Sequence, residues 1–274
     1  MTTFRTQWDN EGYIVARNLF DQARVSRLRE VCDGILAQFL GADAQSGKPG
    51  NPDGYNMRHL NHPAYFKEHP EWFPALMDTA AAPRILQIAA EILGEDALFR
   101  CTTYWFNPRR VSQDGNWHRD SQFVTKSEAE EKQMLAERPR AVQLMLALAP
   151  TEDNEYVPGS HLRWDTPEEY QIRKADGQQH NRANTMPGAI RVRQEPGDMM
   201  AFNPSGLHRG RYHADKLRRT LMLTYTGASY IVKDYFSAQP WFLEAGYLAG
   251  LAPQTSAFFE RFCAVYADFW RSAS

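Results

Sequence analysis

The stretch 96-DALFRCTTYWFNP-108 marks the point where the sequence changes from helical to strand-like patterns. Aromatic and apolar residues fill this stretch, and Asp, Asn and Pro bound it, which is typical of a β-strand. Three later runs have the same character: 141-AVQLMLALA-149, 198-DMMAFNP-204 and 218-RRTLMLTYT-226. Together the four runs predict a β core in the middle of the chain.

Helical patterns lie on both sides of this core and within it. The candidates are residues 21–39 behind the N-cap Asp21, residues 82–93 before Gly94, a segment behind the capping box Ser127-x-x-Glu130, a segment behind Thr166, and the tail 255-TSAFFERFCAVYADFW-270. An apolar stripe on the first and last of these indicates that they pack on the core. We therefore expect a mainly β fold, a sandwich or barrel, with a helical jacket.

The length and composition favour a single globular domain over residues 1–274. No repeat is visible, and 43% of the 274 residues are hydrophobic. Two segments, at about 40–58 and 121–140, are predicted to be lid loops, the first because it is rich in Gly, Pro and Asp.

Charge and cysteine content narrow the class of partner. Lys and Arg total 31 against 33 for Asp and Glu, which gives no basic excess for nucleic acid binding. The three cysteines show no metal-type spacing, which indicates reduced thiols. No signal peptide pattern or long apolar run appears, so we expect a cytoplasmic protein without a membrane segment.

The segment 116-NWHRDSQF-123 carries the first chemical signal. If residues 116–122 are extended, His118 and Asp120 point to one side and Arg119 points to the other. Two histidines and one carboxylate on one face of a metal ion leave the opposite positions open, as in non-haem Fe(II) oxygenases. A second histidine from elsewhere is therefore required.

Two histidines suit that role. His208 and His213 follow a predicted strand, whereas His59 and His62 lie beside a long loop and His161 lies in a turn. Residue spacing alone does not separate His208 from His213. An oxygenase that chelates a 2-oxo acid also needs an arginine for the distal carboxylate, and Arg218 and Arg219 open the next strand.

The ordered set of motifs resembles the phytanoyl-CoA dioxygenase family of Fe(II)- and 2-oxoglutarate-dependent oxygenases. The matching features are EGYIVARNLF at 11–20, His118-x-Asp120, VPGSH at 157–161, Gly197-Asp198, His208, and an arginine eleven residues after His208. That offset selects Arg219 over Arg218. It also selects His208 over His213, because Thr224 lies eleven residues after His213.

The resemblance implies a double-stranded β-helix, or jelly roll, with Fe(II) held by His118, Asp120 and His208. It further implies that Arg219 pairs with 2-oxoglutarate, and that O2 converts this co-substrate to succinate and CO2 while a C–H bond of a small organic molecule is hydroxylated. Because Asp120 is retained, hydroxylation is favoured over halogenation. Some members carry a hydroxyl residue where this chain has Gly210, so one contact to 2-oxoglutarate is expected to be missing.

Several further residues are candidates for the site. Gln143 on the strand AVQLML is a candidate hydrogen-bond partner of 2-oxoglutarate, although an outward polar residue on an alternating strand fits as well. Tyr104, Trp117, Phe123 and Trp164 are candidate substrate contacts, although aromatic side chains are more often part of the core.

Three alternatives to a hydroxylase remain open. The same iron site supports desaturation, epoxidation or cyclisation. A jelly-roll protein that binds a ligand without turnover retains similar residues. A zinc hydrolase uses the same three ligands but gives no reason for the arginine.

Overall fold

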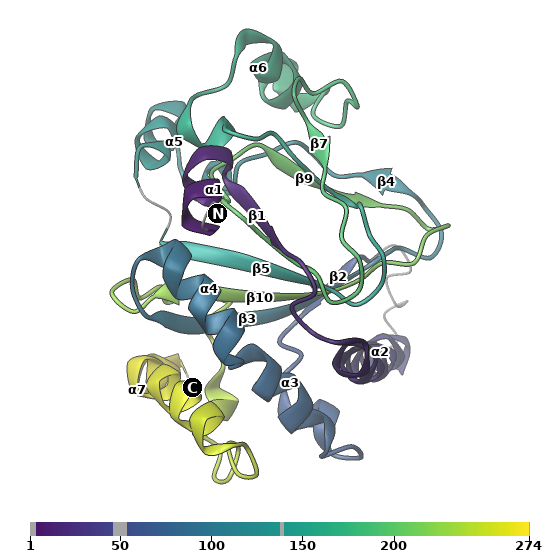
Figure 1. The fold of residues 1–274 in the computed structure, drawn as a ribbon, viewed down its shortest axis with the longest axis vertical. Coiled ribbons are helices and arrows are strands. Elements are labelled where there is room, and N and C mark those ends of the chain that lie inside the picture. The colour runs from purple at the N-terminus through teal and green to yellow at the C-terminus, as the bar shows by residue number, and fades with distance from the viewer. Residues whose placement is uncertain (1–3, 46–53, 138–139, 274) are drawn as a thin grey trace.

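Two antiparallel sheets face each other in the computed structural model, which describes residues 4–45, 54–137 and 140–273 (Figure 1). The six-stranded sheet has the order β1-β8-β5-β10-β3-β2, and the four-stranded sheet has the order β4-β9-β6-β7. The strands are β1 (Tyr13–Ala16), β2 (Asn56–Arg58), β3 (Ala97–Phe106), β4 (Gln113–Asp114), β5 (Ala141–Ala147), β6 (Asn154–Tyr156), β7 (Ile190–Arg191), β8 (Met199–Phe202), β9 (His208–Tyr212) and β10 (Arg219–Gly227). The predicted jelly roll is confirmed, and each of the four strand-like runs forms a strand of the larger sheet.

Side chains on β10 alternate between the two faces of the larger sheet. Leu221 and Leu223 belong to the core that includes the helices, so they face outward from the sandwich. Met222 packs with Met145 and Phe202 in a separate cluster between the sheets, so it faces inward. The same alternation determines which side chains at the start of β10 face the interior.

The helices Pro83–Leu93 and Pro253–Ala273 cover the outer face of the larger sheet (Figure 1). The helices are α1 (Phe4–Glu11), α2 (Gln22–Gln45), α3 (Trp72–Ala80), α4 (Pro83–Leu93), α5 (Glu128–Leu135), α6 (Pro167–Arg173) and α7 (Pro253–Ala273). Asp21 caps α2 by accepting a hydrogen bond from the Arg24 amide at 2.8 Å. Gly94 ends α4 in the left-handed conformation with φ of 76°, so these two predicted boundaries are confirmed.

The first predicted lid loop contains more regular structure than expected, and the second contains the helix predicted behind Ser127. Helix α2 continues to Gln45 and β2 pairs with β3, so the predicted loop at 40–58 is wrong at both ends. Residues 46–53 of that segment lie outside the described residues. In the segment 121–140, α5 begins where Ser127 accepts from the Glu130 amide, but the Glu130 carboxylate accepts from the Lys126 amide instead of closing the predicted capping box. Residues 138–139 also lie outside the described part.

Within the described ranges, no helix has the length and apolar character needed to span a membrane.

Candidate metal centre

His118, Asp120 and His208 converge in the structure. Their ligand-type atoms all lie within 4.8 Å of one another, and within the described ranges they are the one group of three or more His, Cys, Asp or Glu with this geometry. Asp120 Oδ1 lies 3.5 Å from His118 Nε2 and 3.4 Å from His208 Nε2. The two imidazole centroids are 4.2 Å apart. Residues ninety positions apart in the chain therefore share one site, whereas His213 bonds Asp114 elsewhere.

Backbone hydrogen bonds bring the three residues together. His118 and His208 face each other in an antiparallel bridge, with N–O distances of 3.1 and 3.0 Å. The Asp120 amide donates to the Pro204 carbonyl at 2.8 Å. The expectation that residues 116–122 are extended is wrong beyond Arg119, because a 3-10 turn begins at Asp120 (η2, Asp120–Phe123). The strand-like alternation of side chains therefore ends at Asp120, the second of the two ligand candidates in this segment.

The orientation of each imidazole is fixed by a main-chain carbonyl. His118 Nδ1 lies 2.6 Å from the Asn116 carbonyl, and His208 Nδ1 lies 2.9 Å from the Gly206 carbonyl. A carbonyl only accepts, so each Nδ1 carries the proton and each Nε2 presents its lone pair to the cluster. Such support fixes the tautomer and ring orientation of metal-binding histidines.

Charges in the cluster suit a divalent cation. Burial raises the pKa of Asp120, but the neighbouring His118 and His208 side chains outweigh this effect and hold it below the usual range. Burial, followed by the charge of His118, lowers the pKa of His208. The carboxylate is therefore ionised and the His208 imidazole is neutral, which are the forms that bind metal ions.

Gln143 supports the carboxylate of the cluster. Its Nε2 donates to Asp120 Oδ2 at 2.9 Å, which leaves Oδ1 directed at the imidazoles. Gln143 therefore faces inward, and its amide is already engaged with a metal-ligand candidate.

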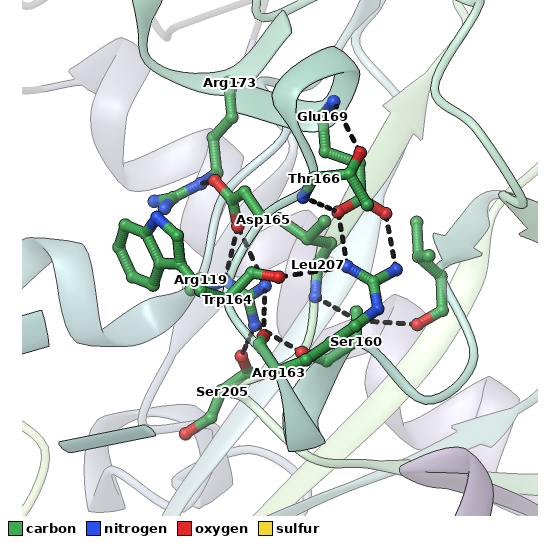
Figure 2. A network of polar contacts seen from close by, with 12 residues as sticks. Arg119, Ser160, Arg163, Trp164, Asp165, Thr166, Glu169, Arg173, Ser205 and Leu207 are labelled. Atoms are coloured by element: carbon green, nitrogen blue, oxygen red, sulfur yellow. Dashed lines mark hydrogen bonds and ion pairs between the residues drawn. The ribbon is translucent and has the colours of Figure 1, made fainter. Parts of the chain in front are cut away.

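Arg119, between the two ligand candidates in the chain, lies in a polar network with Asp165, Ser160 and Ser205 (Figure 2). Its Nη2 donates to Asp165 Oδ1 at 2.8 Å, and its Nη1 donates to the carbonyls of Ser160 and Ser205. Ser205 precedes Gly206, whose carbonyl orients His208. One buried guanidinium therefore ties the His118–Asp120 segment to the turn that carries the second histidine.

The charges around Arg119 extend to α5 and α6. Asp165 also accepts from Arg173 at 2.7 Å, and Arg173 pairs with Glu131 at 2.6 Å. The Trp164 ring packs among four cations: Arg119, Lys132, Arg173 and Lys174. Trp164, expected at the substrate, is thus part of the structure that holds the two helices.

The two arginines at the start of β10 point in opposite directions. Arg219 shares the outward parity of Leu221, and its Nε donates to Asp33 on α2. Arg218 is 1% exposed and points between the sheets, where Nη2 donates to Asn154 Oδ1 at 3.0 Å and Nη1 donates to the Arg211 carbonyl at 3.2 Å. The structure therefore brings Arg218, and not the expected Arg219, to the inner face that carries His208.

Arg218 belongs to a cluster of buried donors on the inner face. Four side-chain donors there have no hydrogen-bond partner among the described residues: Arg218 Nε, Asn154 Nδ2, Trp105 Nε1 and Thr220 Oγ1. They lie on adjacent positions, since Thr220 pairs with Trp105 across the sheet and Asn154 contacts Arg218. Buried donors are normally satisfied, so an unmet group of them indicates a ligand that accepts hydrogen bonds. Arg218, Thr220 and Met222 lie at intervals of two positions, so strand alternation places Arg218 and Thr220 on the same inner face as Met222, and this spacing was visible in the sequence.

The other aromatic candidates separate into two groups. Tyr104 faces outward and donates to Asp33 Oδ1 at 3.0 Å, and Trp117 packs in a separate core beneath Arg209. Phe123, in contrast, is 68% exposed, with its ring centroid 5.3 Å from that of His118. Of these three, Phe123 alone lies beside the metal-ligand cluster.

Known proteins share this arrangement of sheets. An ectoine dioxygenase of Sphingopyxis alaskensis is 21% identical over 257 residues, 86% of this chain and 80% of that protein. The crystal structure of EctD from S. alaskensis with 2-oxoglutarate and 5-hydroxyectoine has a TM-score of 0.59 at 19% identity, covering 92% of this chain and 85% of that one. The carbocyclase SnoK from nogalamycin biosynthesis has a TM-score of 0.55 at 18% identity, covering 82% and 83%.

A family profile gives the assignment. The profile described as phytanoyl-CoA dioxygenase (PhyH) matches residues 8–220, which include the three ligand candidates and both arginines of the β10 start. The match spans well over half of the chain, and the family expected from the sequence motifs is confirmed. The protein therefore belongs to the phytanoyl-CoA dioxygenase family.

Proposed function

We propose that this non-haem Fe(II)- and 2-oxoglutarate-dependent dioxygenase hydroxylates an unactivated C–H bond of a small organic molecule. The observation that carries the proposal is the convergence of His118, Asp120 and His208 next to a buried group of unmet donors around Arg218. The first group suits a metal ion with open positions, and the second suits a carboxylate.

The three ligand candidates fit Fe(II). Two neutral imidazole nitrogens and one carboxylate oxygen form the donor set that this ion takes in oxygenases. His118 Nε2, His208 Nε2 and Asp120 Oδ1 would hold the metal, with Gln143 orienting the carboxylate through its other oxygen. Bound Fe(II) and 2-oxoglutarate would supply the oxidising chemistry with O2, releasing succinate and CO2.

Arg218 is the residue that we assign to the distal carboxylate of 2-oxoglutarate. Its Nε has no hydrogen-bond partner among the described residues, and Asp153 Oδ2 lies 4.0 Å from this atom, beyond hydrogen-bond distance. A charged donor of this kind forms strong hydrogen bonds with a carboxylate. Arg219, which the motif offset selected, already contacts Asp33 on the opposite face.

The substrate approaches from the side of Phe123. This exposed ring beside His118 offers an apolar contact at the edge of the metal site. The relatives named as an ectoine dioxygenase and a carbocyclase support a small organic substrate. The carbocyclase also favours cyclisation as the second candidate outcome of the same site.

Anaerobic addition of Fe(II) and 2-oxoglutarate tests the proposal. A visible charge-transfer band should appear with the unchanged protein and vanish in His208→Ala, while His213→Ala serves as a matched control that retains the band. Asp120→Ala should weaken iron retention and abolish turnover. Succinate release under air but not argon excludes a zinc hydrolase, and a missing band in the unchanged protein would favour a ligand-binding protein.

A further inference from the structure

The side chain of Tyr212 folds back over its own strand. His208, Gly210 and Tyr212 share one face of β9 by strand alternation, and His208 is the metal-ligand candidate among them. A Cβ built on Gly210 would lie 2.4 Å from the Tyr212 hydroxyl oxygen and 2.8 Å from its Cζ. The hydroxyl therefore occupies the space that any side chain at position 210 would fill.

The Tyr212 ring is held rigidly in this position. It stacks on Tyr55 with centroids 4.1 Å apart and on Trp105 with centroids 6.1 Å apart. Position 115 also lacks a side chain, because a Cβ on Gly115 would lie 2.5 Å from the Gly210 carbonyl oxygen and 3.3 Å from Tyr212 Cε2. Two glycines and two aromatic rings thus determine where the hydroxyl lies.

The Tyr212 hydroxyl lies between the metal-ligand candidate His208 and the guanidinium of Arg218. Position 210 is two residues from His208, about 6 to 7 Å along the strand. It pairs with Asn154, whose side chain accepts from Arg218. The Arg218 Cζ atom lies 5.3 Å from the Tyr212 ring centroid, and the hydroxyl interacts with the guanidinium. A 2-oxo acid that bound the metal at one end and Arg218 at the other would therefore lie next to this hydroxyl.

We propose that the Tyr212 hydroxyl donates a hydrogen bond to the distal carboxylate of 2-oxoglutarate, alongside Arg218. The inference rests on the proposed function. It makes Gly210 part of the binding site, because the glycine leaves room for a hydroxyl delivered by the neighbouring tyrosine. The contact expected to be missing at position 210 is in this way supplied from position 212.

The protonation state of the phenol supports this role. Burial raises the pKa of Tyr212 to about 12, and the charge of Arg218 opposes the increase. The hydroxyl therefore keeps its proton at neutral pH and acts as a donor to a carboxylate.

The test measures 2-oxoglutarate affinity through the anaerobic charge-transfer band. Tyr212→Phe should raise the apparent Kd of 2-oxoglutarate by roughly tenfold or more, as expected for one lost hydrogen bond to a charged group. The affinity for Fe(II) alone and the thermal unfolding midpoint should stay near those of the unchanged protein, which separates a binding contact from a structural one. An unchanged Kd for 2-oxoglutarate would overturn the proposal.

A transfer of the hydroxyl gives a second, independent test. Tyr212→Leu should weaken 2-oxoglutarate binding, and adding Gly210→Ser to that variant should restore part of the affinity, because the serine hydroxyl takes the vacated space. Gly210→Ser alone should abolish binding through the clash with the tyrosine. If the double variant binds no better than Tyr212→Leu, the hydroxyl is not the contact. Absence of the band in the unchanged protein is a separate outcome, which contradicts the proposed function itself.

Discussion

Arg119 and Arg218 are both buried, yet they differ in how their donors are used. Every guanidinium nitrogen of Arg119 has a partner: Nε and Nη2 contact Asp165 Oδ1 at 3.1 and 2.8 Å, and Nη1 contacts two carbonyls. Arg218 keeps a buried Nε without a hydrogen-bond partner among the described residues, and its ion-pair contact with Asp153 is as long as 4.0 Å. A buried cation with complete partners stabilises the fold, whereas one with unmet donors indicates a site for an anion.

The surroundings of the two arginines differ in the same way. Arg119 pairs with the buried carboxylate of Asp165, which also pairs with Arg173 (Figure 2). Around Arg218 the neighbouring buried groups, Trp105 and Thr220, add further unmet donors. Arg119 is therefore closely paired with a buried carboxylate, whereas Arg218 has only a long contact with Asp153 and lies among unmet donors.

The largest effect is expected from Arg119→Ala. Removing one partner of a buried ion pair typically costs about 3 to 5 kcal/mol, and Asp165 would be left beside a cavity. Because the Ser205 carbonyl also loses its donor, Fe(II) affinity should fall by about 10- to 100-fold. Urea unfolding and anaerobic iron titration measure the two effects.

The matched control for Arg119 is Arg163→Ala. Arg163 pairs with Glu169 in the same network, but its side chain is 42% exposed. The Glu169 carboxylate of this pair is buried, so the free energy of unfolding should fall, but iron binding should change little because the Arg163 side chain contacts none of the groups that orient the metal-ligand candidates. Equal losses of iron affinity in the two variants would show that the network as a whole, and not Arg119, supports the metal ligands.

Arg218→Ala should mainly weaken 2-oxoglutarate. Loss of hydrogen bonds from a charged donor costs about 1.5 to 3 kcal/mol, which corresponds to roughly 10- to 100-fold in the apparent Kd. Arg218→Lys should recover only part of this affinity, because an ammonium group lacks the planar pair of donors. Unchanged 2-oxoglutarate binding in Arg218→Ala would mean that the unmet donors serve another ligand.

The sequence predicted that His118, Asp120 and His208 converge, because the chemistry of these residues is visible in their type and order. The offset of eleven residues selected Arg219, whereas the structure places Arg218 on the inner face, because the direction of a side chain depends on its position in the strand and not on its distance from His208. The face of each arginine is set by strand pairing, in which Thr220 lies opposite Trp105. Counting back in steps of two from the inward-facing Met222 leads to Thr220 and then to Arg218.

Other features were beyond sequence reasoning for a similar physical reason. Tyr104 and Trp164 are aromatic residues near the motifs, but tertiary packing decides whether such rings face a cavity or a helix. The Tyr212 hydroxyl reaches position 210 only because its ring folds over a glycine, a contact that no periodicity records. The strands β3, β5, β8 and β10, in contrast, follow local patterns and were found nearly at their boundaries, whereas α2 runs beyond its predicted end at residue 39 to Gln45.

A smaller effect is expected from Gln143→Leu, which removes the donor to Asp120 Oδ2. A neutral amide bonded to a carboxylate contributes about 1.5 kcal/mol, so Fe(II) affinity should fall by roughly tenfold before any 2-oxoglutarate is added. The iron titration without co-substrate distinguishes this role from a direct contact with 2-oxoglutarate. If only the Kd of 2-oxoglutarate rises, Gln143 serves the oxo acid and not the metal ligand.

The smallest effect is expected from Arg219→Ala, and it tests the parity argument directly. The pair with Asp33 is partly exposed, so its loss should lower the free energy of unfolding by about 0.5 kcal/mol. The apparent Kd of 2-oxoglutarate should stay unchanged, because the side chain lies on the outer face with Leu221 and the helices. A large rise in that Kd for Arg219→Ala, with Arg218→Ala unaffected, would shift the register of β10 by one residue. The motif offset would then be the better guide, and the unmet donors around Arg218 would need another ligand.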